Sequence, residues 1–507
     1  MQNTRAFSLK RMIARSKTVV LSSLLAVASS LGASKPALAN GRFPRAERLI
    51  ESPTDSNKLY LAATYGLLVT TDRGCTWYHV CEAAFSFESR YTGDPVVSLT
   101  GNGSLLVGTQ ASLSLSTDNA CDWTQTLVSP ASPKESFFDL TVAASAPHPI
   151  IVGSTSYQPT GPVNQLHEST DGGMTWKPIG TPLPLALLNT VDVDPTDPTH
   201  IYATGLTTTT DALDTGVFVS STDHGASWSS NPIPNTYAWA NPYIARIHPT
   251  DPKKIFVRTD GWKDRDVVET ADDALLYSSD GGKTWKEILH PGGPADSSPG
   301  AKLFGFALSP DGSTVLAGYG DPVDSARFVE PSWFGVYKSS TDGQFSFGPD
   351  PANPLPPILP AEPISCITWN KTGIYVCFEP GGEDSFLGFA TAPNFTSRAS
   401  MTTLMKVNQT KGVPPNCMGR AVTTCDWTVD CLNLDACDGG AATGSGAAGG
   451  TTCAMTGVDA GTGGSVDQPK SCNCRAPGRA SSDGGQAIGW LFAAMVVRRR
   501  RRRIRHG

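Results

Sequence analysis

The sequence predicts an all-β fold, a seven-bladed β-propeller of four-stranded antiparallel blades. Three observations support this prediction. An eight-residue motif recurs about every fifty residues, a pair of short apolar segments accompanies each copy, and the composition is that of a loop-rich β protein. A turn motif repeated at this spacing is typical of a radial array of small sheets.

The repeated motif reads Ser/Thr-x-Asp-x-Gly-x-Thr/Ser-Trp. Clear copies span Ser169–Trp176, Ser221–Trp228 and Ser278–Trp285, and weaker copies span Thr70–Trp77, Ser116–Trp123 and Ser340–Phe347. The six aspartates follow one another at intervals of 46, 53, 52, 57 and 62 residues. The motif residues to which we assign a structural role are Asp72, Trp77, Asp118, Trp123, Asp171, Trp176, Asp223, Trp228, Asp280, Trp285, Asp342 and Phe347.

The residue types of the motif indicate what each position does. Asp bonds nearby backbone amides and Gly accepts positive φ, so the two favour a tight hairpin between the third and fourth strands of a blade. The tryptophan then has a large apolar surface, roughly 150–250 Å², to bury between neighbouring sheets.

Seven strand pairs accompany the motifs, and they predict the first and second strands of seven blades over residues 40–410. The pairs begin at Arg48, Val96, Phe138, Thr190, Ala245, Phe304 and Ile364. A seventh motif is expected at Phe389–Ser397, where the aspartate and tryptophan are missing. Either Thr402–Val407 or the segment near Asn40 completes a terminal blade.

The motifs resemble those of the BNR or Asp-box repeat family, which includes sialidases, some endo-glucanases, sortilin-type receptors and photosystem-assembly propellers. The resemblance covers the propeller region and implies the fold. It does not imply a particular reaction, because one fold carries many functions.

The composition and the N-terminus predict an exported protein. Charged residues make up only 17% of the 507 residues, and 50 glycines and 39 prolines indicate many turns. Residues 1–39 combine basic residues, the apolar run Val19–Leu31 and Ala37-Leu38-Ala39, the pattern of a secretory signal peptide. The alternative is a retained membrane anchor, for which the apolar run is short. The twelve cysteines are then expected to meet an oxidising compartment.

The C-terminal part of the chain differs from the propeller in composition. Residues 411–471 are rich in Cys and Gly and are expected to form a disulfide knot, including Cys417 and Cys453, and a flexible linker. Residues 472–507 combine Cys472 and Cys474, a short apolar stretch and an arginine cluster. This tail resembles the MYXO-CTERM sorting signal, which implies cleavage by a myxosortase-type protease and surface anchoring through one of the two cysteines. A permanent transmembrane helix is the alternative.

Charge argues against nucleic acid as a partner. Without residues 1–39 and the tail from Arg475 onward, 25 basic and 45 acidic side chains remain, a formal net charge of −20. Such a surface repels a polyanion. We therefore expect an extracellular glycan or a cell-envelope protein as the partner, with membrane contact only through the C-terminal anchor.

Strand parity predicts where a ligand binds. The connections between strands two and three share one face of the propeller with those between strand four and the next blade. The long connections Ser154–Leu166, Leu206–Thr215, Asp260–Ala274 and Tyr319–Trp333 all join strands two and three. Binding surfaces are commonly built from such loops on a rigid scaffold, although the alternative is neutral drift of tolerant loops. The candidate ligand contacts are Trp262, Arg265, Arg327 and Trp333.

Cys366 and Cys377 are expected to form a disulfide. They flank the turn Asn370–Gly373 symmetrically, which places them opposite each other across a hairpin.

Catalysis is the alternative function. A sialidase needs clustered arginines, and residues 91–245 contain none. Asp264, Asp266 and Glu269 are the carboxylates that a sialidase-like or endo-glucanase-like hydrolase has available on the same face. No spacing typical of a zinc site, a nucleophilic triad or a phosphate loop occurs, so no cofactor or metal is predicted. The favoured reading is a non-catalytic binding module.

Overall fold

A computed structural model describes residues 46–64, 66–87, 94–130, 134–207, 215–234, 236, 240–261, 274–288, 302–320, 334–342, 345, 357–360, 362–378, 386–406 and 410–417. The predicted signal peptide and sorting tail, and the cysteines between 418 and 471, lie outside these residues.

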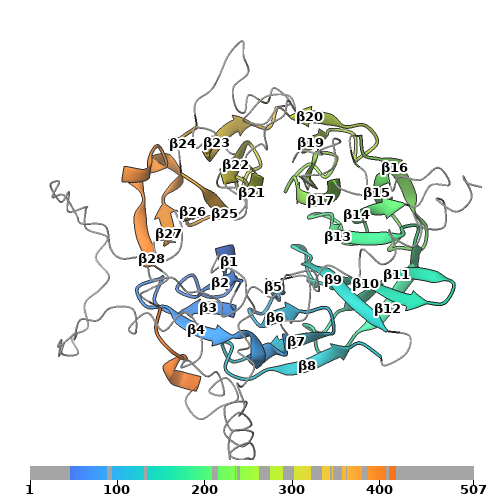
Figure 1. The fold of residues 1–507 in the computed structure, drawn as a ribbon, viewed down its shortest axis with the longest axis horizontal. Helices are drawn as coiled ribbons and strands as arrows, with labels where there is room; N and C mark the ends of the chain where they lie inside the picture. The colour runs from blue at the N-terminus through green and yellow to red at the C-terminus, as the bar shows by residue number, and fades with distance from the viewer. Residues whose placement is uncertain are drawn as a thin grey trace, which may run out of the picture. The chain divides into compact units, whose positions relative to one another are not determined.

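The described strands form seven four-stranded antiparallel sheets, which confirms the predicted seven-bladed β-propeller (Figure 1). Blade 1 contains β1 (Ala46–Glu51), β2 (Leu59–Ala63), β3 (Gly66–Thr70) and β4 (Tyr78–Cys81); blade 2 contains β5 (Val96–Leu99), β6 (Leu105–Gly108), β7 (Ser112–Ser116) and β8 (Thr124–Val128). Blade 3 contains β9 (Glu135–Val142), β10 (Ile150–Gln158), β11 (Gly161–Ser169) and β12 (Lys177–Leu183); blade 4 contains β13 (Leu187–Val193), β14 (Ile201–Thr207), β15 (Thr215–Ser221) and β16 (Ser229–Pro232).

The remaining blades follow the same order. Blade 5 contains β17 (Ala240–Ile247), β18 (Ile255–Gly261), β19 (Leu275–Ser278) and β20 (Lys286–Ile288); blade 6 contains β21 (Lys302–Leu308), β22 (Thr314–Gly320), β23 (Gly335–Ser340) and β24 (Leu359–Pro360). Blade 7 contains β25 (Ile364–Trp369), β26 (Ile374–Phe378), β27 (Phe386–Ala390) and β28 (Thr402–Lys406). Short 3-10 turns are η1 (Glu82–Phe85), η4 (Ala392–Asn394), η5 (Arg398–Ser400) and η7 (Pro415–Cys417).

The core lies between the blades, because the middle strands of a blade are covered on both faces. All five residues of β2 and all five of β3 are buried, whereas no residue of the outer strand β8 is buried. Adjacent blades share apolar clusters, such as the one that joins Phe256 and Tyr277 of blade 5 to Tyr319 of blade 6. The continuous apolar runs in the sequence are therefore middle strands that face two neighbours.

The ring closes without strand exchange. Thr402–Lys406 forms β28, the outer strand of blade 7, so the first of the two expected segments completes the terminal blade. Blade 7 meets blade 1 through hydrogen bonds from Thr368 Oγ1 to the Leu49 carbonyl, 2.9 Å, and from Trp77 Nε1 to the Leu404 carbonyl, 3.2 Å. Closure therefore depends on packing between two complete blades.

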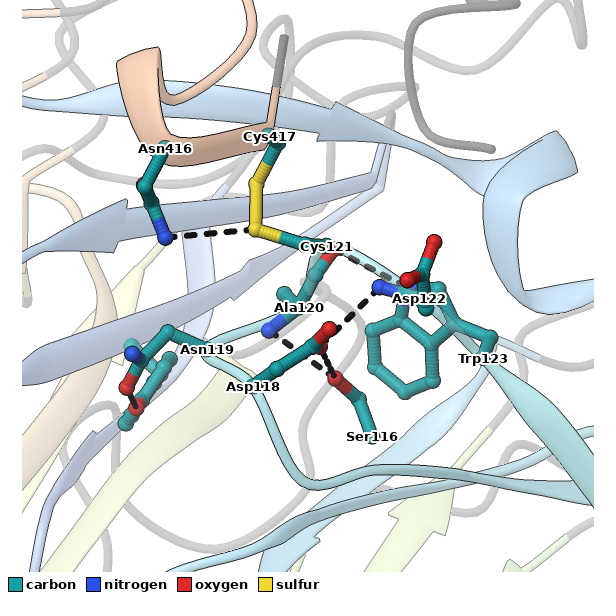
Figure 2. Close-up of a disulfide and its surroundings, with 10 residues drawn as sticks. Ser116, Asp118, Asn119, Ala120, Cys121, Asp122, Trp123, Asn416 and Cys417 are labelled. Atoms are coloured by element: carbon teal, nitrogen blue, oxygen red, sulfur yellow. Dashed lines mark hydrogen bonds between the residues drawn. A yellow bond between two sulfur atoms is a disulfide. The ribbon is translucent and has the colours of Figure 1, made fainter. Parts of the chain in front are cut away.

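A C-terminal strap, residues 410–417, follows blade 7 in the chain and contacts blades 1 and 2. Lys411 forms a parallel bridge with Tyr78, beside the outer strand of blade 1, and its amide donates to the Trp77 carbonyl at 2.9 Å. The strap ends at a disulfide between Cys417 and Cys121 of blade 2, and the Asn416 amide also contacts the Cys121 sulfur at 3.2 Å (Figure 2).

This disulfide corrects the expectation that Cys417 belongs to a separate knot. Cys417 and Cys121 are both fully buried in one cluster with apolar residues of blades 1 and 2. The sequence shows no sign of the pairing because 296 residues separate the two cysteines. The expected Cys366–Cys377 disulfide is present, between directly paired positions of β25 and β26.

Two expected connection lengths are wrong. Ser154–Leu166 is not a long loop, because β10 and β11 continue as a regular hairpin to the pair Gln158 and Gly161. Conversely, blade 6 has a long connection between its third and fourth strands, from Ser340 to Leu359. The expectation that every long excursion shares one face therefore does not hold for blade 6.

Candidate functional site

The motif aspartates accept hydrogen bonds within the hairpin turns that contain them. In blade 3, Asp171 Oδ1 accepts hydrogen bonds from the Met174 and Thr175 amides, at 3.0 and 2.9 Å, and from the Ser169 hydroxyl at 2.8 Å. The Thr175 hydroxyl and amide, with the Ser169 hydroxyl and the Met174 amide, lower the pKa of Asp171 to about 2. This carboxylate is therefore ionised at neutral pH and is engaged in hydrogen bonds of its own turn. That arrangement fits the structural role assigned to the motif aspartate.

The motif aromatic residues connect each blade to the preceding one. Trp176 Nε1 donates to Thr126 Oγ1 of blade 2 at 3.1 Å, and Trp228 Nε1 donates to the Thr181 carbonyl of blade 3 at 3.1 Å. Trp123 and Trp285 make edge contacts with aromatic rings of blades 1 and 4, respectively. In blade 6, Phe345 contacts Phe256 and Tyr277 of blade 5, while Phe347 lies outside the described residues.

The candidate ligand and catalytic residues from the sequence lie outside the described residues. They are Trp262, Arg265, Arg327, Trp333, Asp264, Asp266, Glu269, Cys472 and Cys474. The flanking strands do fix which connections carry the loop residues. Positions 262–273 join β18 to β19, and positions 321–333 join β22 to β23, so both connections run between second and third strands.

The described residues contain a charged group that sequence reasoning missed. Arg48, Asp139, Asp192 and Arg246, here called the inner-strand charge cluster, lie on β1, β9, β13 and β17. These are the first strands of blades 1, 3, 4 and 5, and such strands surround the centre of the ring in Figure 1. A signal was present in the sequence, because each charge interrupts an apolar strand one or three residues before its end.

The carboxylates of Asp139 and Asp192 link blades 3 and 4 by hydrogen bonds. Asp139 Oδ2 of blade 3 accepts a hydrogen bond from the Val191 amide of blade 4 at 3.0 Å. In return, Asp192 Oδ1 of blade 4 accepts one from the Thr141 hydroxyl of blade 3 at 2.9 Å. The reciprocal bonds fix the inner edges of β9 and β13 against each other.

Burial changes the protonation of both acids. Desolvation raises the pKa of Asp139 to about 7, against the hydrogen bonds from the Val191 and Leu140 amides and the attraction of Arg48. Desolvation also raises the pKa of Asp192, against the Val193 amide and Arg246. At neutral pH Asp139 is therefore a mixture of acid and carboxylate.

The two arginines differ from the acids in their hydrogen bonding. Both side chains are exposed, and neither makes a hydrogen bond or an ion pair with any residue in the described part of the chain. Partial desolvation by the surrounding strands, followed by repulsion from Arg246, lowers the pKa of Arg48, while Asp139 and Asp192 oppose the shift. Arg48 therefore interacts electrostatically with charges that belong to three other blades.

A second buried polar group lies within blade 3. His167 Nε2 contacts Glu135 Oε1 at 2.9 Å and Ser154 Oγ at 3.1 Å, and Ser154 is fully buried. The hydrogen bond from His167 is the main cause that lowers the pKa of Glu135. Because serine and glutamate share one ring nitrogen, the imidazole does not relay a proton between two partners as a hydrolytic triad does. The group ties β9, β10 and β11 together.

The described residues hold no group of three or more His, Cys, Asp or Glu side chains arranged to bind a metal ion. Among the same residues, no helix has the length and apolar character needed to cross a bilayer.

The seven four-stranded sheets define a β-propeller, and a family model of a propeller family agrees with that class. A family model described as sortilin, neurotensin receptor 3, matches residues 164–292, about a quarter of the chain. No curated protein matches.

Solved structures similar to this chain include glycoside hydrolases and a sialidase. An ancestral GH74 enzyme is 14% identical with a TM-score of 0.45, over 72% of this chain and 47% of the other. The GH74 enzyme of Niastella koreensis is 15% identical with a TM-score of 0.38, over 71% and 58%. The Hadza microbial sialidase Hz136 is 13% identical with a TM-score of 0.35, over 64% and 72%. The chain spans about half the length of the GH74 enzymes, and the likeness concerns the fold alone.

Proposed function

We propose that this chain is an exported, surface-anchored propeller that binds an extracellular glycan or a cell-envelope protein without catalysis. The binding surface consists of the connections between second and third strands. The observation that carries the proposal is topological. The strand ends at Thr207 and Thr215, Gly261 and Leu275, and Gly320 and Gly335 bracket three long connections. All three leave the same end of their blades because every blade has the same antiparallel order.

The rigid part of the molecule supports a binding role. The hydrogen-bonded motif turns and the shared apolar clusters hold each blade against its neighbours, so the connections start from fixed strand ends. The β10–β11 hairpin adds a described, exposed tip at the same end, where the Tyr157 side chain is 47% exposed. An exposed aromatic side chain can stack on a sugar ring or fill a pocket of a protein partner.

The test uses paired shortenings on opposite faces. In the mature chain, residues 262–273 are replaced by a short Gly/Ser linker, and a control variant shortens residues 346–356 in the connection between β23 and β24. Cell-envelope fractions and a glycan array provide ligands. We expect the first variant to lose capture and the control to retain it. Equal capture by both variants contradicts the proposal that the ligand binds to the connections between second and third strands.

Export and anchoring are tested separately. The full chain is expressed in its native cell type, and surface exposure is measured by protease shaving of intact cells. We expect the chain to be shaved from the surface, and replacement of Cys472 and Cys474 by Ser to release it into the medium. Retention of the native chain inside the cell contradicts export.

Glycoside hydrolysis is a second candidate, favoured by one observation. Asp139 and Asp192 lie on adjacent inner strands, and burial raises the pKa of both. Such hydrolases use a pair of carboxyl groups, one of which is kept protonated by a raised pKa. Against this, both acids already accept hydrogen bonds across the blade interface. Release of reducing sugar by the native chain, abolished in Asp139→Asn, supports this candidate, and no release from a polysaccharide panel removes it.

A further inference from the structure

We propose that residues 421–437 are held against the outer edge of blade 1, where two of their three cysteines form disulfides with Cys75 and Cys81. The three cysteines are Cys425, Cys431 and Cys437. The bonds fix the chain beyond the strap to the rim of the ring. The inference does not rest on the proposed function, because it follows from the cysteines of the propeller itself.

Cys75 and Cys81 of blade 1 are both oxidised. Each of the two is disulfide-bonded. The other four cysteines before residue 418 pair with one another, as Cys121–Cys417 and Cys366–Cys377. The chain has twelve cysteines, and the remaining six all follow residue 417. Within one chain, Cys75 and Cys81 therefore either bond to each other or each take a partner from those six.

The positions of Cys75 and Cys81 exclude a bond between them. In the pairing of β3 with β4, Tyr78 is opposite Val69 and Cys81 is opposite Gly66. A strand rises about 3.3 Å per residue, so the Cα atoms of Tyr78 and Cys81 are about 10 Å apart. Cys75 lies beyond Tyr78, in the motif turn before β4 begins. A disulfide requires Cα atoms within about 7 Å, so each cysteine bonds elsewhere.

The outer edge of blade 1 already carries C-terminal chain. The His79 amide of β4 donates to the Lys411 and Gly412 carbonyls, at 3.2 Å each, and the Lys411 amide donates to the Trp77 carbonyl. His79 and Val80 are buried, whereas no residue of β8 or β16, the outer strands of blades 2 and 4, is buried. Proteins commonly cover a sheet edge with a further segment. The strap thus brings the chain that follows it to this edge.

Cysteine spacing favours residues 421–437 as the segment that is bonded there. Eight residues separate Cys417 from Cys425, at most about 29 Å of extended chain, so Cys425 stays near the blades that hold Cys417. The cysteines at 425, 431 and 437 are six residues apart, and the same separation divides Cys75 from Cys81. One stretch of six residues can therefore span both ends of β4.

Composition favours the same segment. Four large apolar side chains lie between its cysteines, namely Trp427, Val429, Leu432 and Leu434. Residues 438–452, by contrast, are mostly Gly, Ala and Thr. Burial of apolar side chains against a sheet edge is favourable, and a Gly-rich linker has none to bury.

Each proposed bond joins two thiols, which together lose two protons and two electrons. A disulfide oxidant of the thiol–disulfide oxidoreductase class accepts them by exchange and is reduced to its dithiol. Such oxidants act in oxidising compartments. The proposal therefore requires that the chain folds in one.

The bonds would separate the tethered segment from the long connections of the ring. Together with Cys121–Cys417 they hold C-terminal chain on blades 1 and 2. The three long connections between second and third strands belong to blades 4, 5 and 6. The chain beyond residue 437 thus starts from a different part of the ring.

The first experiment is disulfide mapping of the mature chain, alkylated and digested without reduction. Trypsin leaves Cys75 and Cys81 together in the peptide 74–90, and it leaves the cysteines from 425 to 453 together in the peptide 421–470. We expect mass spectrometry to find these two peptides joined, and to find them separate after reduction.

Chymotrypsin then assigns the individual bonds, because it cleaves within both peptides. Its sites separate Cys75 from Cys81 and separate the successive cysteines of residues 421–437, at Tyr78, Trp427 and Leu434. We expect Cys75 and Cys81 each to be linked to Cys425, Cys431 or Cys437, in a chain that is monomeric on non-reducing gels.

A second experiment measures the tether directly. A site for a specific protease is inserted after Arg420, so that cleavage leaves the C-terminal fragment attached only through the proposed bonds. The native chain should retain the fragment until reductant is added. The double variant Cys75→Ser and Cys81→Ser should release it without reductant, and the matched control Cys366→Ser and Cys377→Ser should retain it.

The mapping decides the proposal even where the double variant fails to fold, because it uses the native chain. A free thiol at Cys75 or Cys81, a direct bond between them, or a covalent dimer overturns the proposal. Pairing with Cys453, Cys472 or Cys474 also overturns it, because the tether then lies outside residues 421–437. Release of the fragment from the native chain without reductant is equally contradictory.

Discussion

Single residues in this propeller divide between turn formation and blade contact. Asp171 illustrates the first role, since one carboxylate satisfies two backbone amides and a hydroxyl of its own hairpin. Asp139 illustrates the second, since its carboxylate crosses to the backbone of the next blade. The same residue type thus has a lowered pKa in one place and a raised pKa in the other, because hydrogen bonds dominate the first and desolvation the second.

Asp171→Ala should lower the free energy of unfolding by about 1–3 kcal/mol, because the Met174 and Thr175 amides lose their acceptor. The control is Met174→Ala, whose side chain is 61% exposed and makes no part of the turn. It should change stability by less than about 0.5 kcal/mol. Chemical denaturation measures both, and equal losses contradict the turn's role. The Asp171 contribution should also fade as pH falls from about 4 toward 2.

Asp139→Asn should flatten the pH dependence of stability between about pH 4 and 7. The folded-state pKa of Asp139 is about 7 and thus lies above the unfolded value. The folded chain therefore binds more protons in this window, and stability contributed by the neutral acid is lost as pH rises through 7. Because the side chain is partly accessible, we expect a difference on the order of 1 kcal/mol across the window. Thermal unfolding at several pH values measures it, and parallel curves for both proteins are the contradictory result.

At the scale of elements, the two disulfides constrain the chain to different extents. One lies inside a hairpin, and the other holds the strap. The Cys366–Cys377 disulfide closes a separation of 11 residues inside one hairpin, whereas Cys121–Cys417 closes one of 296 residues. Loop closure costs more entropy in the unfolded chain when the loop is longer. The strap disulfide is therefore the stronger constraint.

Replacing both Cys121 and Cys417 by Ser should lower the free energy of unfolding by roughly 5 kcal/mol, against roughly 3 kcal/mol for the matched pair Cys366 and Cys377. Denaturation under non-reducing conditions compares the two double variants. A larger loss from the hairpin pair shows that the strap bond does not constrain the unfolded chain as inferred.

The whole molecule depends on the seam between blades 7 and 1. Six interfaces join blades that are consecutive in the chain, but the seam joins the two ends of the array. Its contacts are Trp77 with Leu404, Thr368 with Leu49, and the strap beside β4. No strand is shared across it among the described blades. The strap therefore supplies a connection that the blade order does not.

Truncation after residue 409 should open the seam without unfolding the other blades. Hydrogen exchange should increase in β4 and β28 relative to β14 and β15 of blade 4, because the removed strap follows β28 in the chain, lies beside β4 and ends in the apolar cluster of blades 1 and 2. Truncation after residue 417 keeps the strap and its disulfide and serves as the control. Uniform acceleration, or none, shows that the strap does not secure the seam.

Features formed by residues close together in the sequence could be predicted, whereas features formed by residues far apart could not. The Cys366–Cys377 pairing was predictable because the hairpin register is local. The inner-strand charge cluster was not predicted, because its four residues lie on strands of four different blades, which surround one centre only when the blades form a ring. The long connection after Ser340 was also missed, because a weak copy of the motif was read as a tight turn.

The sequence by itself determined the blade count, the strand order and the hairpin turns, because each depends on apolar runs and turn residues within about fifty positions of one another. Only the tertiary structure decided how the ring closes, which cysteine holds the strap and which polar side chains join neighbouring blades. Those contacts join residues hundreds of positions apart, and their energies exist only after every blade has packed against its neighbours.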